Sequence, residues 1–359
     1  MKEERTLKRP IIVNARFLTQ SVTGVQRFAI EVSKRLKRMG VPLIFVSPND
    51  IKNLEVAKEL EVKIIGPFRG HLWEQVTLQL YTKLKGGTLV SFCNTAPLFI
   101  KDQIVTVHDL SFLRHPDWFS KRFSIVYSFL VPRIIKRAKR VLTVSEFSKK
   151  EIVDLIKVDE NKIEVVYNGI TSFAIQDEPL DSTEYGHLLK EAYILTVSSH
   201  HPRKNFKNLI EAFSLMEDPT LKLYVIGDFN KNYSNVDIPN AGLKNVVFLE
   251  NIGDQDLVRF YQNAKLFVYP SFYEGFGIPI IEAISMETMC AVSDIPVFTE
   301  LFEASVYYFD PSSKESIANS IQYALSNPKG ISELQEVRET ILKKFSWDRS
   351  AKKVLEQFN

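Results

Sequence analysis

Cysteine is scarce in this chain, whose 359 residues include only Cys93 and Cys290. Two thiols so far apart provide neither a disulfide framework nor a metal-ligand cluster, and they favour a reducing compartment. Long apolar runs are also lacking. The most apolar stretch, residues 123–135, is interrupted by polar residues and a proline, and it is shorter than the roughly 20 residues that a membrane-spanning helix needs. Since no apolar segment follows the basic N-terminus, we expect a cytoplasmic protein without a secretory signal.

Core-forming residues are abundant, with 45% hydrophobic and 25% charged residues. At roughly 100–200 residues per domain, the length predicts two domains. The net charge of +3 hides an asymmetry between the two halves of the chain. Residues 1–170 carry 29 Lys and Arg against 17 Asp and Glu (+12), and residues 171–359 carry 17 against 26 (−9). A basic half indicates a partner such as phosphate, nucleic acid or an anionic membrane.

Short apolar strand patterns alternate with amphipathic helix patterns along almost the whole chain. This alternation predicts an α/β protein with two doubly wound, Rossmann-like domains, each with a parallel sheet covered on both faces. The pattern breaks at a polar stretch that contains Asn-Gly and a proline. We therefore expect a first domain over residues 1–170, a linker over 171–190, a second domain over 191–344, and a final helical segment over 345–359. Ligands of such sheets bind beyond the carboxyl ends of the strands.

The most informative segment is residues 269–283, which follow an apolar strand and open a helix. Glu274 and Glu282 are eight positions apart, and Gly275 and Gly277 between them allow a ligand to approach the backbone closely. Amides at the start of the helix suit a phosphate. Glu274 is then a candidate for binding sugar hydroxyls, and Glu282 for a ribose diol. The alternative is that the glycines only permit a tight turn and that Glu282 is a solvated helix residue.

This segment resembles the E-x7-E signature of retaining, nucleotide-sugar-dependent glycosyltransferases of family 4. Their fold, called GT-B, has two Rossmann-like domains that face each other across a cleft. The resemblance implies a donor-binding second domain, an acceptor-binding first domain, and a last helix that crosses back to the first domain. It extends over nearly the whole chain and also involves the loop at Gly24 and residues 108–110, 167–169, 202–205 and 345–351.

Arg203 and Lys204 follow the predicted strand 193–197 and are expected to start a helix. Two adjacent cations there suit a diphosphate and would neutralise its charge as it leaves. Solvated surface cations are the alternative. The resemblance implies that Lys204 is the lysine that stabilises the leaving group. Where the family commonly has an arginine, this chain has Ser199, so Arg203 is expected to supply the second charge.

Two residues of the first domain are further candidates. His108 ends the predicted strand 104–107, where a lone histidine is more often structural. The resemblance implies that it orients the donor sugar without acting as a general base. Gly24 lies between the first strand and the first helix, where it is either an ordinary turn glycine or lets the helix N-terminus face the donor phosphate.

The remaining donor contacts are expected in the second domain. The resemblance places the loop Gly275, Phe276 and Gly277 against the donor, and it places Phe248 and Leu249 where backbone groups read the base. An apolar run at that place is also typical of a core strand, so the base stays open.

The chain has weak signals for metal or nucleic acid. Asp254-Gln255-Asp256 matches the D-x-D pattern of metal-dependent glycosyltransferases, but it opens an amphipathic helix in which acids suit the N-terminal amides. We predict no divalent metal and no cofactor. The basic segment 121–140 contains Phe123, Tyr127 and Phe129 at helical spacing, which predicts one buried face rather than a nucleic-acid surface. With the basic residues of 34–38, this segment is a candidate for peripheral contact with an anionic membrane.

Together these features predict a retaining, metal-independent hexosyltransferase that uses a nucleotide-sugar. Residues 14–20 and 24–27 resemble bacterial O-antigen and capsule mannosyltransferases, which makes GDP-mannose the first candidate among several possible donors. The expected acceptor is a glycan or a lipid-diphosphate-linked glycan of a surface polysaccharide. The resemblance implies that the acceptor hydroxyl attacks from the face that the leaving group vacates, with a phosphate oxygen taking its proton. Two alternatives stay open: a sugar-nucleotide epimerase or hydrolase on the same scaffold, and a non-enzymatic protein that binds anionic membranes.

Overall fold

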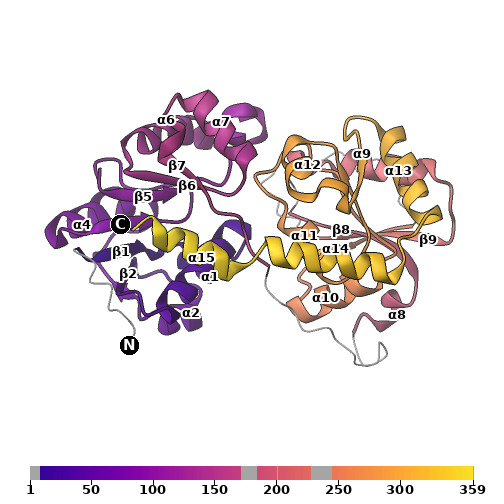
Figure 1. Cartoon of the computed structure of the whole chain (residues 1–359), viewed down its shortest axis with the longest axis horizontal. Helices are drawn as coiled ribbons and strands as arrows, with labels where there is room; N and C mark the ends of the chain where they lie inside the picture. The colour runs from indigo at the N-terminus through magenta and orange to yellow at the C-terminus, as the bar shows by residue number, and fades with distance from the viewer. Residues whose placement is uncertain (1–8, 171–183, 200, 228–244, 359) are drawn as a thin grey trace. The chain divides into compact units, whose positions relative to one another are not determined.

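The computed structural model describes residues 9–170, 184–199, 201–227 and 245–358. The chain divides into two units, one comprising residues 1–169 with 346–359, the other residues 170–345. In each unit, helices cover both faces of a parallel sheet (Figure 1). The fold is therefore the predicted pair of doubly wound α/β units. Most of the predicted linker, residues 171–183, lies outside the described residues.

The first unit is built on a seven-stranded sheet with the strand order β3-β2-β1-β4-β5-β6-β7. Neighbouring strands are parallel throughout. The strands are β1 (Ile11–Asn14), β2 (Leu43–Ser47), β3 (Lys63–Ile64), β4 (Thr88–Ser91), β5 (Gln103–Thr106), β6 (Arg140–Thr143) and β7 (Ile163–Val165). The helices are α1 (Gly24–Arg38), α2 (Leu54–Glu59), α3 (Gly70–Leu72), α4 (Gln79–Lys85), α5 (Ser111–Arg114), α6 (Lys121–Arg137), α7 (Glu146–Ile156) and α15 (Trp347–Glu356).

The second unit has a six-stranded parallel sheet with the order β10-β9-β8-β11-β12-β13. Its strands are β8 (Ala192–Val197), β9 (Leu221–Ile226), β10 (Val246–Leu249), β11 (Leu266–Tyr269), β12 (Cys290–Ser293) and β13 (Tyr307–Phe309). Its helices are α8 (Gly186–Leu189), α9 (Phe206–Leu215), α10 (Asp254–Asn263), α11 (Ile278–Ser285), α12 (Pro296–Phe302), α13 (Lys314–Ser326) and α14 (Ile331–Lys344).

Each sheet has one point at which the strand order reverses direction. In the first unit it lies between β1 and β4, where Asn14 pairs with Ser91. In the second unit it lies between β8 and β11. Because the crossover helices on either side of such a point lie on opposite faces, the strand ends leave a crevice there, and ligands of open α/β sheets bind in it.

Glycine and serine bound two helices of the first unit. Gly40 follows α1 with a φ of +78°, the left-handed conformation that ends many helices. Ser145 precedes α7, and its hydroxyl accepts a hydrogen bond from the Ser148 amide at 3.1 Å. The helical segment between β3 and β4 was not predicted. There α3 continues through a π-helical stretch, Trp73–Leu78, into α4. Trp73 anchors it, since its Nε1 donates to the Ile65 carbonyl at 2.7 Å.

Helix α6 differs from the predicted single buried face. Its buried residues are Leu130, Val131, Ile134 and Ile135. Phe123 and Tyr127 stack on each other, with ring centroids 3.9 Å apart, and pack against the same core. Phe129, however, is 54% exposed. The expectation for Phe129 is therefore wrong, because the apolar residues of α6 extend beyond the stripe that the core covers.

The C-terminal helix α15 packs on α1 within the first unit, and Figure 1 shows the two side by side. The ring centroids of Trp347 and Phe28 are 6.0 Å apart. Gly169 is required by this packing, because a Cβ there would lie 2.2 Å from the Trp347 backbone nitrogen. At the surface, Arg35 Nε and Asp348 form a 2.9 Å ion pair. Among the helices of the described residues, none has the length and apolarity to cross a bilayer.

Candidate active site

Arg203 and Lys204 lie beyond the carboxyl end of β8, at the point where the strand order of the second sheet reverses. They belong to a 3₁₀ turn, Pro202–Lys204, that precedes α9. The expectation that they start the helix is therefore wrong by a few residues. Asn205 adopts a left-handed conformation (φ +57°). Its side-chain Nδ2 donates to the carbonyls of Pro270 and Pro311 at 3.0 and 2.8 Å. The side chain of Asn205 thus fixes the turn against the segments that follow β11 and β13.

The segment after β11 faces this turn. Its Phe272 amide donates to the Arg203 carbonyl at 2.8 Å, which joins the two loops. Gly277 precedes α11 with a φ of +118°, and a Cβ there would lie 2.9 Å from the Phe298 ring. Both facts require glycine at 277 for the turn itself. A role of Gly277 in donor binding stays a prediction.

A buried ionic cluster joins the two loops. Lys204 Nζ donates to Glu274 Oε1 and also, at 2.7 Å, to the Tyr269 hydroxyl. Arg203 Nη2 lies 3.9 Å from Glu274 Oε2. Lys204 and Glu274 are both more than nine-tenths buried. The structure therefore brings together three residues that the sequence analysis singled out, and it adds Tyr269.

The protonation states in this cluster follow from its geometry. Burial alone would raise the pKa of Glu274, but the charges of Lys204 and Arg203 outweigh it and lower that pKa. Burial and then the Glu274 charge raise the pKa of Tyr269 well above its usual range. Tyr269 thus keeps its proton. Its hydroxyl oxygen lies 3.3 Å from Glu274 Oε1 and donates to it. A lysine and an arginine side by side at this strand end suit a phosphate ligand.

Glu282 lies apart from this cluster, on α11, where it is half-buried. Its Oε2 accepts a hydrogen bond from the Tyr261 hydroxyl of α10 at 3.2 Å. The prediction that Glu282 is a helix residue is confirmed, but it is not simply solvated. Sequence reasoning missed Tyr261 and Tyr269, because a tyrosine in an apolar segment has no signal that separates it from core residues. The position of Tyr269 at a strand's carboxyl end was the available clue.

The other candidates of the second unit occupy different environments. Phe276 is buried, with its ring 5.2 Å from that of Phe345, and Gly275 is also buried. Ser199 is exposed in the loop after β8. Phe248 and Leu249 end β10, an edge strand two strands away from β8, and both are half-buried.

In the first unit, His108 follows β5 and is 6% exposed. Its Nε2 lies 2.9 Å from the Phe92 carbonyl. Since a carbonyl only accepts, Nε2 carries the proton and Nδ1 is the acceptor nitrogen. Burial lowers the pKa of His108, so the ring is neutral. Gly24 is exposed and is the first residue of α1, close to its predicted place between the first strand and the first helix.

The D-x-D pattern has a structural role. Asp254 and Asp256 lie in the first turn of α10, which follows Gly253. Asp256 lies 3.9 Å from Arg259, one turn further along. Two carboxylates at a helix N-terminus stabilise it through the helix dipole. The absence of a metal requirement stays a prediction.

Family models match both units of this chain. The model described as Glycosyltransferase Family 4 matches residues 22–172, and that described as Glycosyl transferases group 1 matches residues 177–342. The chain thus belongs to the family 4 (group 1) glycosyltransferases, a retaining family with the GT-B fold.

Individual relatives agree with this assignment. The O-antigen chain mannosyltransferase RfbU of Salmonella typhimurium is 29% identical over 348 residues, which cover 90% of this chain and 93% of the relative. The O-antigen chain mannosyltransferase B of Escherichia coli is 27% identical, with 70% and 68% coverage. Among solved structures, a glycosyltransferase from Rickettsia africae matches with a TM-score of 0.73 at 18% identity, with 98% of each chain covered. At that identity the structural likeness shows the fold.

Proposed function

We propose that this glycosyltransferase moves a hexose from a nucleotide-sugar to a glycan or a lipid-diphosphate-linked glycan in surface polysaccharide biosynthesis. The observation that carries the proposal is the buried cluster of Lys204, Arg203 and Glu274 at the strand-order reversal of the second sheet. GDP-mannose is the first candidate donor, since the relatives named above are O-antigen mannosyltransferases.

The cationic pair would hold the donor diphosphate. Lys204 is fixed by Tyr269 and Glu274, so its ammonium needs no reorganisation when negative charge develops on the departing nucleoside diphosphate. Arg203 is partly exposed and adds a second charge near the same carboxylate. A preformed charge of this kind stabilises the transition state more than the ground state, which is the requirement for raising kcat.

The carboxylates and the histidine would hold the donor's sugars. Glu274 faces the cations, so a donor sugar hydroxyl bound to it would lie next to the diphosphate. Glu282, oriented by Tyr261, would accept hydrogen bonds from the ribose diol. His108, neutral and with Nδ1 as acceptor, would bind a hydroxyl of the sugar and orient it. A neutral ring whose Nε2 already donates to a carbonyl suits this orienting role better than the role of a general base.

Backbone groups would complete the donor site. The amides of the Gly275–Gly277 loop and the start of α11 suit phosphate oxygens, as do those at Gly24 in the first unit. The Phe276 ring is packed in the core, so this residue would contact the donor through its backbone. Ser199 would donate its hydroxyl to the donor, and the backbone at Phe248 and Leu249 would read the base. Charge neutralisation by Lys204 and Arg203 makes a divalent metal unnecessary in this proposal.

A peripheral membrane contact is supported by α6. Arg122, Ile125, Phe129 and Arg133 recur at intervals of three and four residues, and thus lie on one side of the helix. Ile125 is 71% exposed, and the Arg133 guanidinium lies 3.6 Å from the centre of the Phe129 ring. Apolar side chains flanked by cations favour the surface of an anionic bilayer. We therefore propose that the protein works at the cytoplasmic face of a membrane.

A nucleotide panel tests the proposal. GDP, UDP, dTDP and ADP are compared by thermal shift and isothermal titration calorimetry, and the sugar-nucleotides of the best base follow. We expect one of these nucleoside diphosphates to stabilise the protein, and GDP is the first candidate. Incubation with and without glycan acceptors then separates transfer from hydrolysis or epimerisation, because the last two need no acceptor. A protein that none of the four nucleotides stabilises would refute the donor site.

A further inference from the structure

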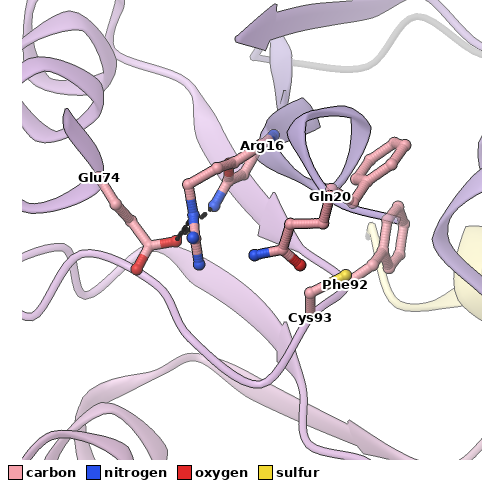
Figure 2. A pocket seen from close by; sticks show the side chains of 7 residues that line it. Arg16, Gln20, Glu74, Phe92 and Cys93 are labelled. Carbon is pink, nitrogen blue, oxygen red and sulfur yellow. Dashed lines mark hydrogen bonds and ion pairs between the residues drawn. The ribbon is translucent and has the colours of Figure 1, made fainter. Parts of the chain in front are cut away.

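A buried ion pair lies near the strand-order reversal of each sheet. In the first unit Glu74 is fully buried, and its Oε2 accepts from Arg16 Nε at 3.1 Å (Figure 2). Two neutral donors share that carboxylate oxygen, Asn14 Nδ2 at 3.0 Å and the Thr95 hydroxyl at 3.2 Å. The cavity beside the pair has about 10 Å³ of room for water-sized groups, which is roughly one water molecule. This pair is therefore closed to larger ligands and serves the fold.

The ion pair of the second unit differs, because both of its charges are proposed to contact the donor. Glu274 is bonded directly to Lys204 in this structure. The proposed function needs the same carboxylate for a sugar hydroxyl and the same ammonium for the diphosphate. A donor must therefore compete with the pair. A buried charge that is released from its partner costs much free energy unless another partner is at hand.

The hydroxyl of Tyr269 is such a partner for both charges. Its oxygen accepts from Lys204 Nζ at 2.7 Å, and its proton is donated to Glu274 Oε1 at 3.3 Å. A hydroxyl can do both because it has one hydrogen and two lone pairs. When the direct contact between Lys204 and Glu274 opens, the bridge leaves each charge a hydrogen bond. The hydroxyl thus lowers the cost of opening the pair to a ligand.

The sheet holds this hydroxyl in place. Tyr269 is the last residue of β11, pairs with Val292 of β12 and is 2% exposed. Its ring packs against that of Phe298 on α12, with the centroids 5.9 Å apart. A tyrosine side chain has few rotatable bonds, whereas the lysine stem is flexible. Tyr269 is therefore a fixed point on which the Lys204 ammonium can shift without losing its acceptor.

We infer that Tyr269 is a positioning residue of the transfer reaction, whose hydroxyl bridges Lys204 and Glu274 so that the pair can open to the donor. The inference rests on the proposed function, since it needs both charges to contact the donor. The opening accompanies donor binding. Tyr269 then keeps the ammonium in place, so that its charge is set before negative charge develops on the leaving group.

Tyr269→Phe tests this role, because it removes the hydroxyl and keeps the packed ring. The ring centre lies 5.0 Å from Lys204 Nζ, and this contact with the cation also stays. Tyr193→Phe is the matched control. Tyr193 is fully buried on the neighbouring strand β8, and its hydroxyl donates to the Phe260 carbonyl at 2.9 Å. Both variants lose a buried hydrogen bond, and urea unfolding measures what each loss costs the fold.

Only Tyr269→Phe should change the reaction. Calorimetry measures the Kd of the nucleoside diphosphate that the wild type binds, and steady-state kinetics measure kcat and KM for the donor. We expect Tyr269→Phe to raise this Kd by about tenfold to a hundredfold, the worth of a hydrogen bond to a charged group. The kcat should also fall, because the ammonium has lost its fixed acceptor. Tyr193→Phe should leave Kd and kcat at their wild-type values.

A second background distinguishes positioning from a general effect on the fold. Glu274→Gln removes the carboxylate, so no ion pair has to open when the diphosphate binds. In that background, adding Tyr269→Phe should change the Kd of the nucleoside diphosphate by about twofold or less, since the two residues act as one unit. A hydroxyl that only stabilises the fold would weaken binding equally with and without Glu274→Gln.

Two results would overturn the inference. One is a Tyr269→Phe variant with the Kd and kcat of the Tyr193→Phe control, and the other is an effect of Tyr269→Phe that persists in full beside Glu274→Gln. The wild type keeps this outcome apart from that of the proposed function. Either result in a chain that binds a nucleoside diphosphate and transfers sugar refutes the bridge alone. A wild type that binds no nucleoside diphosphate refutes the donor site, and the bridge with it.

Discussion

The ammonium of Lys204 and the carboxylate of Glu274 form a buried ion pair between the loops that follow β8 and β11. These residues are seventy positions apart in the chain, but their strands are neighbours in the sheet. The pair is stabilised further by Tyr269, which contacts both. The residue proposed to stabilise the leaving group is therefore held by the residue proposed to bind the donor sugar, and a change in one should alter the other.

Replacing Lys204 by methionine should reduce both stability and turnover. The variant leaves the Glu274 carboxylate buried with the more distant Arg203 as its cation, and removal of one partner of a buried pair typically costs about 3–5 kcal/mol. Loss of a preorganised charge at the leaving group should lower kcat by about 100-fold to 1,000-fold, with a smaller effect on donor KM. Urea unfolding and steady-state kinetics measure the two effects.

The double variant Lys204→Met/Glu274→Gln separates these effects. Removing the second charge should restore much of the lost stability, because no uncompensated carboxylate is left in the core. Activity should stay low, since the ammonium is still missing. Recovery of activity together with stability would show that Lys204 acts only on the fold.

Glu282→Ala should weaken binding of the nucleoside diphosphate. If Glu282 binds the ribose diol, the loss of hydrogen bonds to a charged group should cost about 1.5–3 kcal/mol, which is about tenfold to a hundredfold in Kd. Tyr261→Phe is the control, because it removes only the hydroxyl that orients Glu282 and should have a smaller effect. Equal affinities of wild type and Glu282→Ala in calorimetry would exclude the ribose contact.

Stability should fall in acid because of Glu74. Burial alone would raise the pKa of its carboxyl, but the Arg16 charge, with His71 and Asn14, lowers it from 4.5 to about 2. A pKa lowered on folding means that this stabilisation is complete above pH 4.5 and is lost as the pH falls toward 2. The difference in unfolding free energy between wild type and Glu74→Gln should therefore be large at neutral pH and shrink through this window. A difference that does not vary with pH would contradict the ionised state of Glu74.

The α6 surface should bind vesicles that contain anionic lipid. Ile125→Ser/Phe129→Ser removes exposed apolar side chains without touching the buried face of the helix, so binding should decrease while the melting temperature stays unchanged. Tyr323→Ser, also exposed but on α13, is the matched control. Flotation with phosphatidylglycerol vesicles and with neutral phosphatidylcholine vesicles measures the effect. Equal flotation of the double variant and the control would remove α6 from the membrane contact.

The family resemblance and much of the fold were accessible from the sequence. Strands such as β1 and β8 are short apolar runs between helix patterns, and such local periodicity determines secondary structure where burial and propensity agree. The helix over residues 70–85 was not accessible, because its π-helical stretch with the buried Glu74 breaks the usual spacing. Phe129 was misassigned because spacing along a helix shows which residues share a side but not how wide a stripe the core covers.

The sequence by itself determined the order of strands and helices, the glycine-bounded turns and the pair Glu274 and Glu282, since these follow from local chemistry and from spacing along the chain. Only the tertiary structure decided which charges meet. It joined Lys204 to Glu274, Glu282 to Tyr261 and Arg16 to Glu74. Lys204 meets Glu274 because parallel strands bring distant segments to one edge of a sheet, and Glu282 meets Tyr261 because α10 and α11 are neighbouring helices. Burial then favours arrangements in which a charged group finds a partner.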